Sequence, residues 1–319
     1  MKHAMGVAFL FPGQGSQISG MLHVLPDHPE IRRTLNEVSD SLAQNVFELD
    51  STAALQSTIC VQLALLASGV ATARALIADG AEPEAVAGMS VGAFAAAVVA
   101  GVLKLADSIR LVKQRAEMMV ELYPKGYGLA AIVGLNEEQV TILVQKIHSV
   151  QMPVYVANIN APRQIVIAGS NDGMNRVLEA ALKSGARKAV LLDVSEPSHC
   201  PLLEPVVDVL KKSSRSMRMQ QPKMVYMGNV TGRALRGAEA IADDCTSNIA
   251  HGVRWYDATT VLEELGFRRF LEMPPGHVLS RLAGEAFPDI QTVAVGDISL
   301  RDAVRLGTSQ RDQGKDGLE

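Results

Sequence analysis

The sequence has little of what marks disulfide-rich, metal-binding or nucleic-acid-binding proteins. Its three cysteines, Cys60, Cys200 and Cys245, are widely spaced. An odd number of separated cysteines predicts neither a disulfide framework nor a metal site, and a reducing cytoplasm is the expected setting. The formal net charge is −4, so there is no cationic excess to attract nucleic acid or an anionic membrane surface.

Aromatic residues and long apolar runs are also scarce. Aromatic residues make up 4% of the chain, whereas 48% of all residues are hydrophobic, as expected for a globular protein. The most apolar stretches, residues 63–78 and 91–103, are predicted to be too short or too interrupted to cross a bilayer. The first residues lack the basic and apolar segments of a signal peptide. The 319 residues suffice for one large domain or two smaller ones.

A serine flanked by two glycines stands at residues 88–92, with the sequence Gly-Met-Ser-Val-Gly. A short apolar run precedes it and an alanine-rich, helix-prone run follows. Strand, tight turn and helix in this order are the setting of a nucleophile elbow, with Ser90 as the nucleophile. The glycines fit because a Cβ in so sharp a turn would collide with backbone. An ordinary turn with an incidental serine is the alternative.

The order of predicted elements divides the chain into two parts. Predicted strands at 7–11, 85–87, 224–227 and 269–273, with helices between them, indicate a large α/β-hydrolase-like domain with a parallel sheet core. Residues 126–195 follow a βαββαβ order, which is typical of a small ferredoxin-like subdomain inserted into the larger one. The predicted boundaries are residues 1–125 and 196–305 for the large domain, 126–195 for the subdomain and 306–319 for a flexible tail.

Other polar residues leave two interpretations open. The Gly-rich loop at residues 12–17 follows the first strand, where α/β sheets place ligands, but it also fits an ordinary connection. Gln62 lies in an apolar helix and is most simply a satisfied buried amide. Arg115, on the amphipathic helix 105–122, is most simply a surface residue with a buried stem. His199 stands at a domain junction just before a helix, so structural and functional roles are both open.

Five segments occur in one order along nearly the whole chain, and together they resemble the malonyl-CoA:acyl-carrier-protein transacylases. They are FPGQGSQ at 11–17, GMSVG at 88–92, Arg115, PSHC at 197–200 and VRW at 253–255. Within that family, three details resemble the malonate decarboxylase epsilon subunit. They are STICVQLALL at 57–66, the alanine-rich run at 93–97 where fatty-acid-synthesis enzymes place a Glu, and the Glu196 that precedes the PSH segment.

The resemblance implies catalytic roles for five residues. Ser90 accepts the malonyl group as an ester, and His199 is the base that activates it. The backbone carbonyl of Asn248 holds the imidazole tautomer, although the family usually has Gln at this position. The backbone N–H groups of Gln14 and Val91 form the oxyanion hole.

The resemblance also implies how the acyl group is bound. Arg115 pairs with the free malonyl carboxylate through two parallel hydrogen bonds, which an acetyl group cannot accept. Gln62 and Asn160 are expected to line the acyl pocket. Met89 replaces the His that is common at this position of the family and makes the elbow less polar.

The implied function is a ping-pong S-malonyltransferase that uses malonyl-CoA and binds no metal or permanent cofactor. The expected acceptor is the carrier subunit of malonate decarboxylase, which bears a phosphoribosyl-dephospho-CoA thiol arm. The other subunits of that complex are further expected partners. The alternative is the acyl carrier protein of fatty-acid or polyketide synthesis. An α/β-hydrolase with Asp193 as its acid and an inactive scaffold subunit are less favoured alternatives. Lys183, Arg187 and Lys188 are the candidates for docking an acidic carrier.

Overall fold

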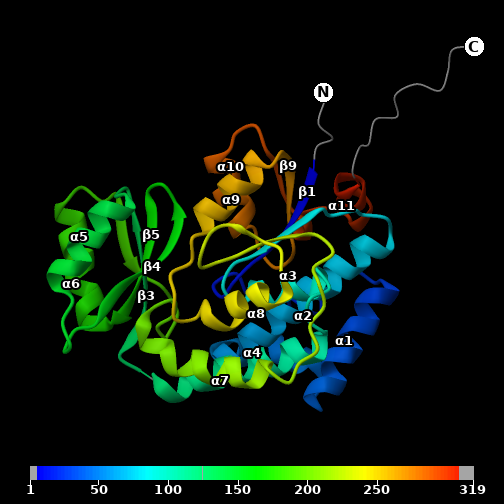
Figure 1. Cartoon of the computed structure of the whole chain (residues 1–319), viewed down its shortest axis with the longest axis horizontal. Coiled ribbons are helices and arrows are strands. Elements are labelled where there is room, and N and C mark those ends of the chain that lie inside the picture. Colours follow the sequence, from blue (N-terminus) through cyan, green and yellow to red (C-terminus); the bar gives the residue numbers. More distant parts are fainter. Residues whose placement is uncertain (1–5, 124, 309–319) are drawn as a thin grey trace, which may run out of the picture.

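A computed structural model describes residues 6–123 and 125–308. Its elements form two sheets with their helices: a large part, which contains both ends of the described chain, and a smaller part that projects to one side (Figure 1, green). The smaller part is formed by one continuous stretch in the middle of the sequence.

The large sheet has the strand order β10-β9-β1-β2-β7-β8. Its first five strands are parallel, and β8 runs antiparallel to β7. The predicted parallel core is therefore confirmed. The strands are β1 (Gly6–Phe11), β2 (Ala85–Gly88), β7 (Val225–Met227), β8 (Ala234–Leu235), β9 (Phe267–Glu272) and β10 (Gln291–Ala294).

Strand β1 is buried along its whole length because helices cover both faces of the sheet. Val7, Phe9 and Phe11 pack into the larger core with one group of helices, whereas Ala8 and Leu10 pack with another. The first group includes α1 (Pro29–Leu42), α2 (Thr58–Ala78), α3 (Gly92–Val99) and α4 (Leu105–Leu122). The second consists of α9 (Trp255–Glu264) and α10 (Val278–Ala286). Strand alternation thus fixes which helices lie on each face.

Helix α2 corrects one prediction from the sequence. It begins at Thr58, so it is longer than the apolar stretch 63–78, and it is long and apolar enough by composition to cross a membrane. However, 83% of its most apolar 18-residue window is buried inside the structure. It is the central helix of the larger core, in contact with α1, α3 and α4.

The small sheet has the order β4-β5-β3-β6, and all its neighbouring strands are antiparallel. Its elements follow the predicted βαββαβ order, and α5 and α6 pack on it through a separate core. The elements are β3 (Tyr127–Val133), α5 (Glu137–Ile147), β4 (Val154–Ala161), β5 (Gln164–Ser170), α6 (Asn171–Lys183) and β6 (Lys188–Leu191).

The remaining elements connect the two parts and close the large domain. Helix α11 (Leu300–Gly307) runs into the predicted tail and packs against α2 and β9, so the tail does not begin at residue 306. Residues 309–319 lie outside the described residues. The others are η1 (Val46–Asp50), η2 (Ala54–Gln56), η3 (Pro201–Leu203), α7 (Glu204–Ser214), α8 (Ala238–Ser247) and η4 (Val295–Asp297).

Candidate active site

The turn between β2 and α3 holds Ser90 in a strained conformation. Its φ is 56°, in the left-handed region that non-glycine residues rarely adopt. A Cβ on Gly88 would lie 2.1 Å from the carbonyl carbon of Gly92, and a Cβ on Gly92 would lie 2.2 Å from the carbonyl oxygen of Phe11. Both positions therefore require glycine, and the turn has the geometry of a nucleophile elbow.

Asn229, which sequence reasoning missed, fixes this turn from the end of β7. Its Oδ1 accepts the backbone N–H of Ser90 at 2.8 Å, and its Nδ2 donates to the carbonyl of Gly88 at 2.9 Å. Asp244 on α8 accepts from the same Nδ2 at 3.3 Å. The available signal was a polar residue at the carboxyl end of a parallel strand beside β2, which is where such sheets place functional groups.

His199, which contacts the serine, is itself the second strained residue of the site, with a φ of 58°. Its Nε2 lies 2.8 Å from Ser90 Oγ, and its Nδ1 lies 2.6 Å from the carbonyl oxygen of Asn248. A carbonyl oxygen only accepts hydrogen bonds, so Nδ1 carries the proton and Nε2 presents a lone pair to the hydroxyl. This is the arrangement that a general base requires.

The environment of His199 keeps its imidazole neutral. Only 3% of the residue is exposed. Burial, followed by the charge of Arg115, lowers the pKa of His199 to about 3. The imidazole is therefore neutral, with the lone pair of Nε2 free, over the whole physiological pH range.

The helical pattern alone predicted that Arg115 lies at the surface. In the structure it is buried instead, and only 1% of the residue is exposed. Its Nη2 donates to Ser90 Oγ at 3.0 Å and its Nη1 to Gln62 Oε1 at 2.6 Å. Among the described residues, no carboxylate forms an ion pair with it, and its Nε has no hydrogen-bond partner. Burial lowers the pKa of the Arg115 guanidinium to about 9. The site thus holds a cation that lacks an anionic partner.

The Gly-rich loop after β1 lies directly against the elbow. A Cβ on Gly13 would lie 2.9 Å from the carbonyl oxygen of Met89, so the two backbones approach as closely as glycine allows. Within the described ranges, the backbone N–H groups of Gln14 and Val91 donate no hydrogen bond. Free donors on both sides of a nucleophile are what an oxyanion hole needs.

Known proteins share both this fold and this chain's sequence. Residues 8–318 match the acyl transferase domain family. The malonyl CoA-acyl carrier protein transacylase of Bacillus subtilis (strain 168) is 33% identical over 297 residues, which are 91% of this chain and 93% of that protein. The Escherichia coli (strain K12) transacylase is 33% identical over 302 residues, covering 93% and 97% of the two chains. The chain belongs to the acyl transferase family, among the malonyl-CoA:acyl-carrier-protein transacylases.

Solved structures agree with this assignment. The transacylase of Coxiella burnetii superposes with a TM-score of 0.90 at 32% identity, covering 96% of this chain and 100% of the other. A malonyl-transacylase in complex with a type II polyketide synthase acyl-carrier protein gives a TM-score of 0.89 at 34% identity, covering 94% and 99%.

Two residues named from the sequence form no hydrogen bond with Ser90, His199 or Arg115 in the described part of the chain. Asn160 lies on β4, and no hydrogen bond joins it to the residues around Ser90. Asp193 is exposed beyond β6. The imidazole Nδ1 of His199 is held by a backbone carbonyl instead. Asp193 therefore does not complete a Ser-His-Asp triad, and the hydrolase alternative built on it is wrong.

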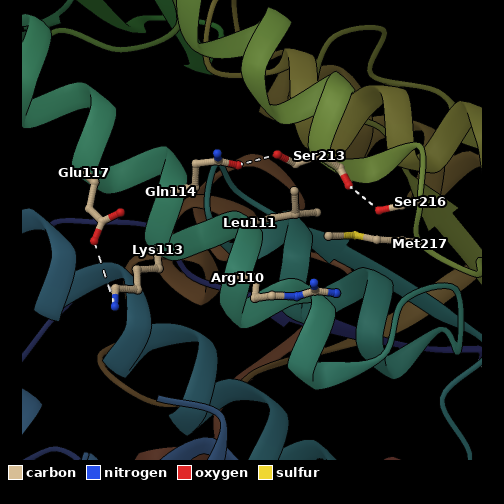
Figure 2. A pocket seen from close by; sticks show the side chains of 8 residues that line it. All are labelled: Arg110, Leu111, Lys113, Gln114, Glu117, Ser213, Ser216 and Met217. Carbon is tan, nitrogen blue, oxygen red and sulfur yellow. Dashed lines mark hydrogen bonds and ion pairs between the residues drawn. The ribbon is translucent and has the colours of Figure 1, made fainter. Parts of the chain in front are cut away.

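Two hollows differ in their relation to the site. A pocket of about 210 Å³ borders it, lined by Gln14, Thr58 and residues 193–195 among others, so it lies where the segment leaving the small sheet meets the large domain. A second groove of about 500 Å³ lies between α4 and α7 (Figure 2). Figure 2 shows Gln114 and Ser213 joined across it, and none of the residues around Ser90 lines it. Of these two hollows, only the first is lined by a residue of the site, Gln14.

No group of three or more His, Cys, Asp or Glu side chains among the described residues is arranged to hold a metal ion. The three cysteines are free thiols, and burial raises the pKa of Cys200 to about 12.

Proposed function

We propose that this chain is an S-malonyltransferase that moves a malonyl group from malonyl-CoA to the thiol of an acyl carrier protein through an ester on Ser90. One observation carries the proposal. A buried guanidinium without an anionic partner lies 3.0 Å from the oxygen of a serine that is hydrogen-bonded to a neutral imidazole. Such a site favours an acyl group that ends in a carboxylate.

The first half-reaction forms the ester. As Ser90 Oγ attacks the thioester carbonyl, its proton passes to His199 Nε2, and the N–H groups of Gln14 and Val91 stabilise the oxyanion. The carbon–sulfur bond then breaks, and the protonated imidazole returns its proton to the CoA sulfur. Asn248 stabilises the imidazolium through its backbone carbonyl, 2.6 Å from Nδ1.

The second half-reaction repeats these steps with the carrier thiol. His199 takes the thiol proton, the sulfur attacks the malonyl ester, and the proton returns to Ser90 as the oxygen leaves. Arg115 pairs with the malonyl carboxylate throughout, with Gln62 fixing the orientation of the guanidinium. Asn160, whose buried Oδ1 has no hydrogen-bond partner among the described residues, stays our candidate for lining the acyl pocket.

We propose acyl carrier protein with a phosphopantetheine-type arm as the acceptor. The named relatives are malonyl CoA-acyl carrier protein transacylases, and one neighbour is bound to its acyl-carrier protein. They favour this alternative over the predicted malonate decarboxylase carrier. Lys183, Arg187 and Lys188 are exposed together at the end of α6 and the start of β6, and we propose them as contacts for an acidic carrier.

The decarboxylase carrier remains a second candidate because of one contact. The Thr58 hydroxyl donates to Glu196 at 2.7 Å, and these residues lie in two of the segments that resemble the epsilon subunit. An acceptor screen separates the candidates. We expect faster malonyl transfer to phosphopantetheinylated acyl carrier protein, and a faster rate with the decarboxylase carrier would reverse the order. Release of free malonate without a thioester product would refute both.

We also propose that the large domain is α/β-hydrolase-like, formed by residues 1–125 and 196–305, and that residues 126–195 form a ferredoxin-like subdomain. The parallel large sheet and the separate core of the small antiparallel sheet support this division. The cytoplasmic setting stays a prediction, which the free cysteines support.

A further inference from the structure

Behind the site lies a buried carboxylate, which the catalytic steps do not use. Glu196, three residues before His199, is 6% exposed and forms no ion pair within the described part of the chain. Its Oε2 accepts a hydrogen bond of 2.7 Å from the hydroxyl of Thr58, at the first residue of α2. Burying a carboxylate is costly unless it is paired or hydrogen-bonded, so this hydrogen bond has to offset part of that cost.

Thr58 continues the contact toward the reacting atoms. Its oxygen accepts from Gln14 Nε2 at 3.1 Å. Gln14 Oε1 in turn lies 3.4 Å from Gln62 Nε2, and Gln62 Oε1 accepts from Arg115 Nη1 at 2.6 Å. A continuous chain of side-chain hydrogen bonds therefore runs from the carboxylate to the guanidinium beside Ser90.

The donors and acceptors in this chain of hydrogen bonds run in one direction, which the Glu196 carboxylate sets. The Thr58 hydroxyl donates its hydrogen to Glu196 Oε2, so it has only lone pairs left to offer Gln14. The Gln14 amide then turns its nitrogen to Thr58 and its oxygen to Gln62. Gln62 consequently presents its oxygen, not its nitrogen, to Arg115. Each amide orientation follows from the one before it.

We propose that Glu196 and Thr58 are positioning residues, which act through Gln14 and Gln62 to hold the Arg115 guanidinium in register for the malonyl carboxylate. This inference rests on the malonyl transfer proposed above. It predicts that removing the hydrogen bond between Thr58 and Glu196, far from Arg115, weakens recognition of malonyl groups. Acetyl groups have no carboxylate for Arg115, so their transfer depends on this alignment only through the hydrogen bond from Arg115 to Ser90 Oγ and should lose less than malonyl transfer.

The test compares Thr58→Val with Thr58→Ser. Valine keeps the volume but removes the hydroxyl, whereas serine keeps the hydroxyl as a matched control. Formation of acyl-enzyme is followed by intact mass with malonyl-CoA and, separately, with acetyl-CoA. We expect Thr58→Val to lower kcat/KM for malonyl-CoA about tenfold, mainly through KM, as for the loss of one buried hydrogen bond. Thr58→Ser should stay within about twofold, because its hydroxyl can make the same bonds.

The variant Glu196→Leu tests the other end of the same bond. It should lower the malonyl-to-acetyl ratio as Thr58→Val does, and the double variant should be no worse than either single one, because both break one chain. Equal losses with malonyl-CoA and acetyl-CoA, or equal losses in Thr58→Ser and Thr58→Val, would overturn the inference. If Thr58→Val does not fold, Glu196→Leu decides by the same ratio.

The outcomes also separate this inference from the function on which it rests. If the unmodified protein forms no malonyl ester, the proposed function fails, and the inference fails with it. If the ester forms normally but the variants leave the malonyl-to-acetyl ratio unchanged, only the inference fails.

Discussion

The imidazole of His199 and the hydroxyl of Ser90 are 109 residues apart in the sequence, yet their Nε2 and Oγ atoms lie 2.8 Å apart. Both residues have a positive φ, and each turn is held by hydrogen bonds from elsewhere in the chain. The backbone N–H of His199 donates to the carbonyl of Ile249 at 2.6 Å, next to the Asn248 carbonyl that holds its ring. The large domain thus builds this pair from three separate segments of the chain.

Arg115→Ala should separate malonyl from acetyl chemistry. Removing the guanidinium takes away the partner of the malonyl carboxylate, so the malonyl-to-acetyl ratio of kcat/KM should fall by about 10³-fold or more. Arg115→Lys is the matched control, because it keeps a positive charge but loses the two-pronged geometry, and its loss should be intermediate. The ratio is measured by acyl-enzyme formation. Equal losses for both acyl groups would mean that Arg115 only supports the fold.

The pH dependence of ester formation should lack the acid limb expected of an ordinary histidine. Since burial and Arg115 lower the pKa of His199 to about 3, the base stays neutral between about pH 5 and 8 and the rate should be flat there. Arg115→Ala removes one of the two causes, so its acid limb should lie at higher pH. The profile of kcat/KM for malonyl-CoA measures this. A limb with an apparent pKa near 6.5 in the unmodified protein would contradict it.

The same pKa shift has a consequence for stability. The folded state resists protonation of His199, whereas the unfolded chain takes up a proton near pH 6.5. The unfolded state therefore binds more protons below that pH, and the contribution of His199 to stability decreases as the pH falls from about 6.5 toward 3. Urea unfolding across this range should show a smaller decrease for His199→Gln, which cannot titrate. Equal decreases in both proteins would exclude His199 as the cause.

Asn229→Ala should damage the elbow without touching the reacting atoms. It leaves the Ser90 N–H and the Gly88 carbonyl unpaired in a buried turn, which should cost about 1–3 kcal/mol of unfolding free energy. Ester formation should slow as well, because Ser90 loses its fixed position. Urea unfolding and acyl-enzyme kinetics measure the two effects. An unchanged midpoint together with an unchanged rate would show that Asn229 does not fix the turn.

Gly88→Ala and Gly237→Ala form a matched pair of glycine substitutions. A Cβ at Gly88 meets backbone at 2.1 Å, whereas a Cβ at Gly237 has nothing within 4 Å and a backbone φ of −112°. Gly88→Ala should therefore destabilise the protein by about 3 kcal/mol or more. Gly237→Ala should cost only about 1 kcal/mol, because Gly237 is the N-cap of α8 and alanine caps a helix less well. Thermal unfolding of both variants is the measurement. Similar melting temperatures would mean that the elbow tolerates a side chain.

The long periodic segments could be predicted from the sequence, because local pattern determines them. Helix α4 begins and ends where the pattern placed it, at Leu105–Leu122. Helix α8 was missed: it is short, and its buried face depends on contact with α7. The elbow was found because its Gly-x-Ser-x-Gly pattern and the flanking strand and helix are local, although the clash that requires Gly92 is with the distant Phe11.

Relations between distant segments could not be read from local pattern. Arg115 occupies a helix position typical of a surface residue, and its burial depends on α2 and the elbow packing around it. The hydrogen bond from Thr58 to Glu196 joins residues 138 apart, and neither residue is unusual in its own segment. Asn229 is likewise an ordinary loop residue until β7 pairs with β2. These contacts exist only after the sheet has formed, so only the structure reveals them.

The account depends most directly on a covalent malonyl group at Ser90. Protein incubated with malonyl-CoA in the absence of a carrier, then digested and analysed by mass spectrometry, should carry one malonyl group on the peptide that contains residues 88–92. The group should be absent in Ser90→Ala and should disappear from the unmodified protein when a carrier thiol is added. A protein that transfers malonyl groups without this ester, or that carries the group on another residue, would contradict the account.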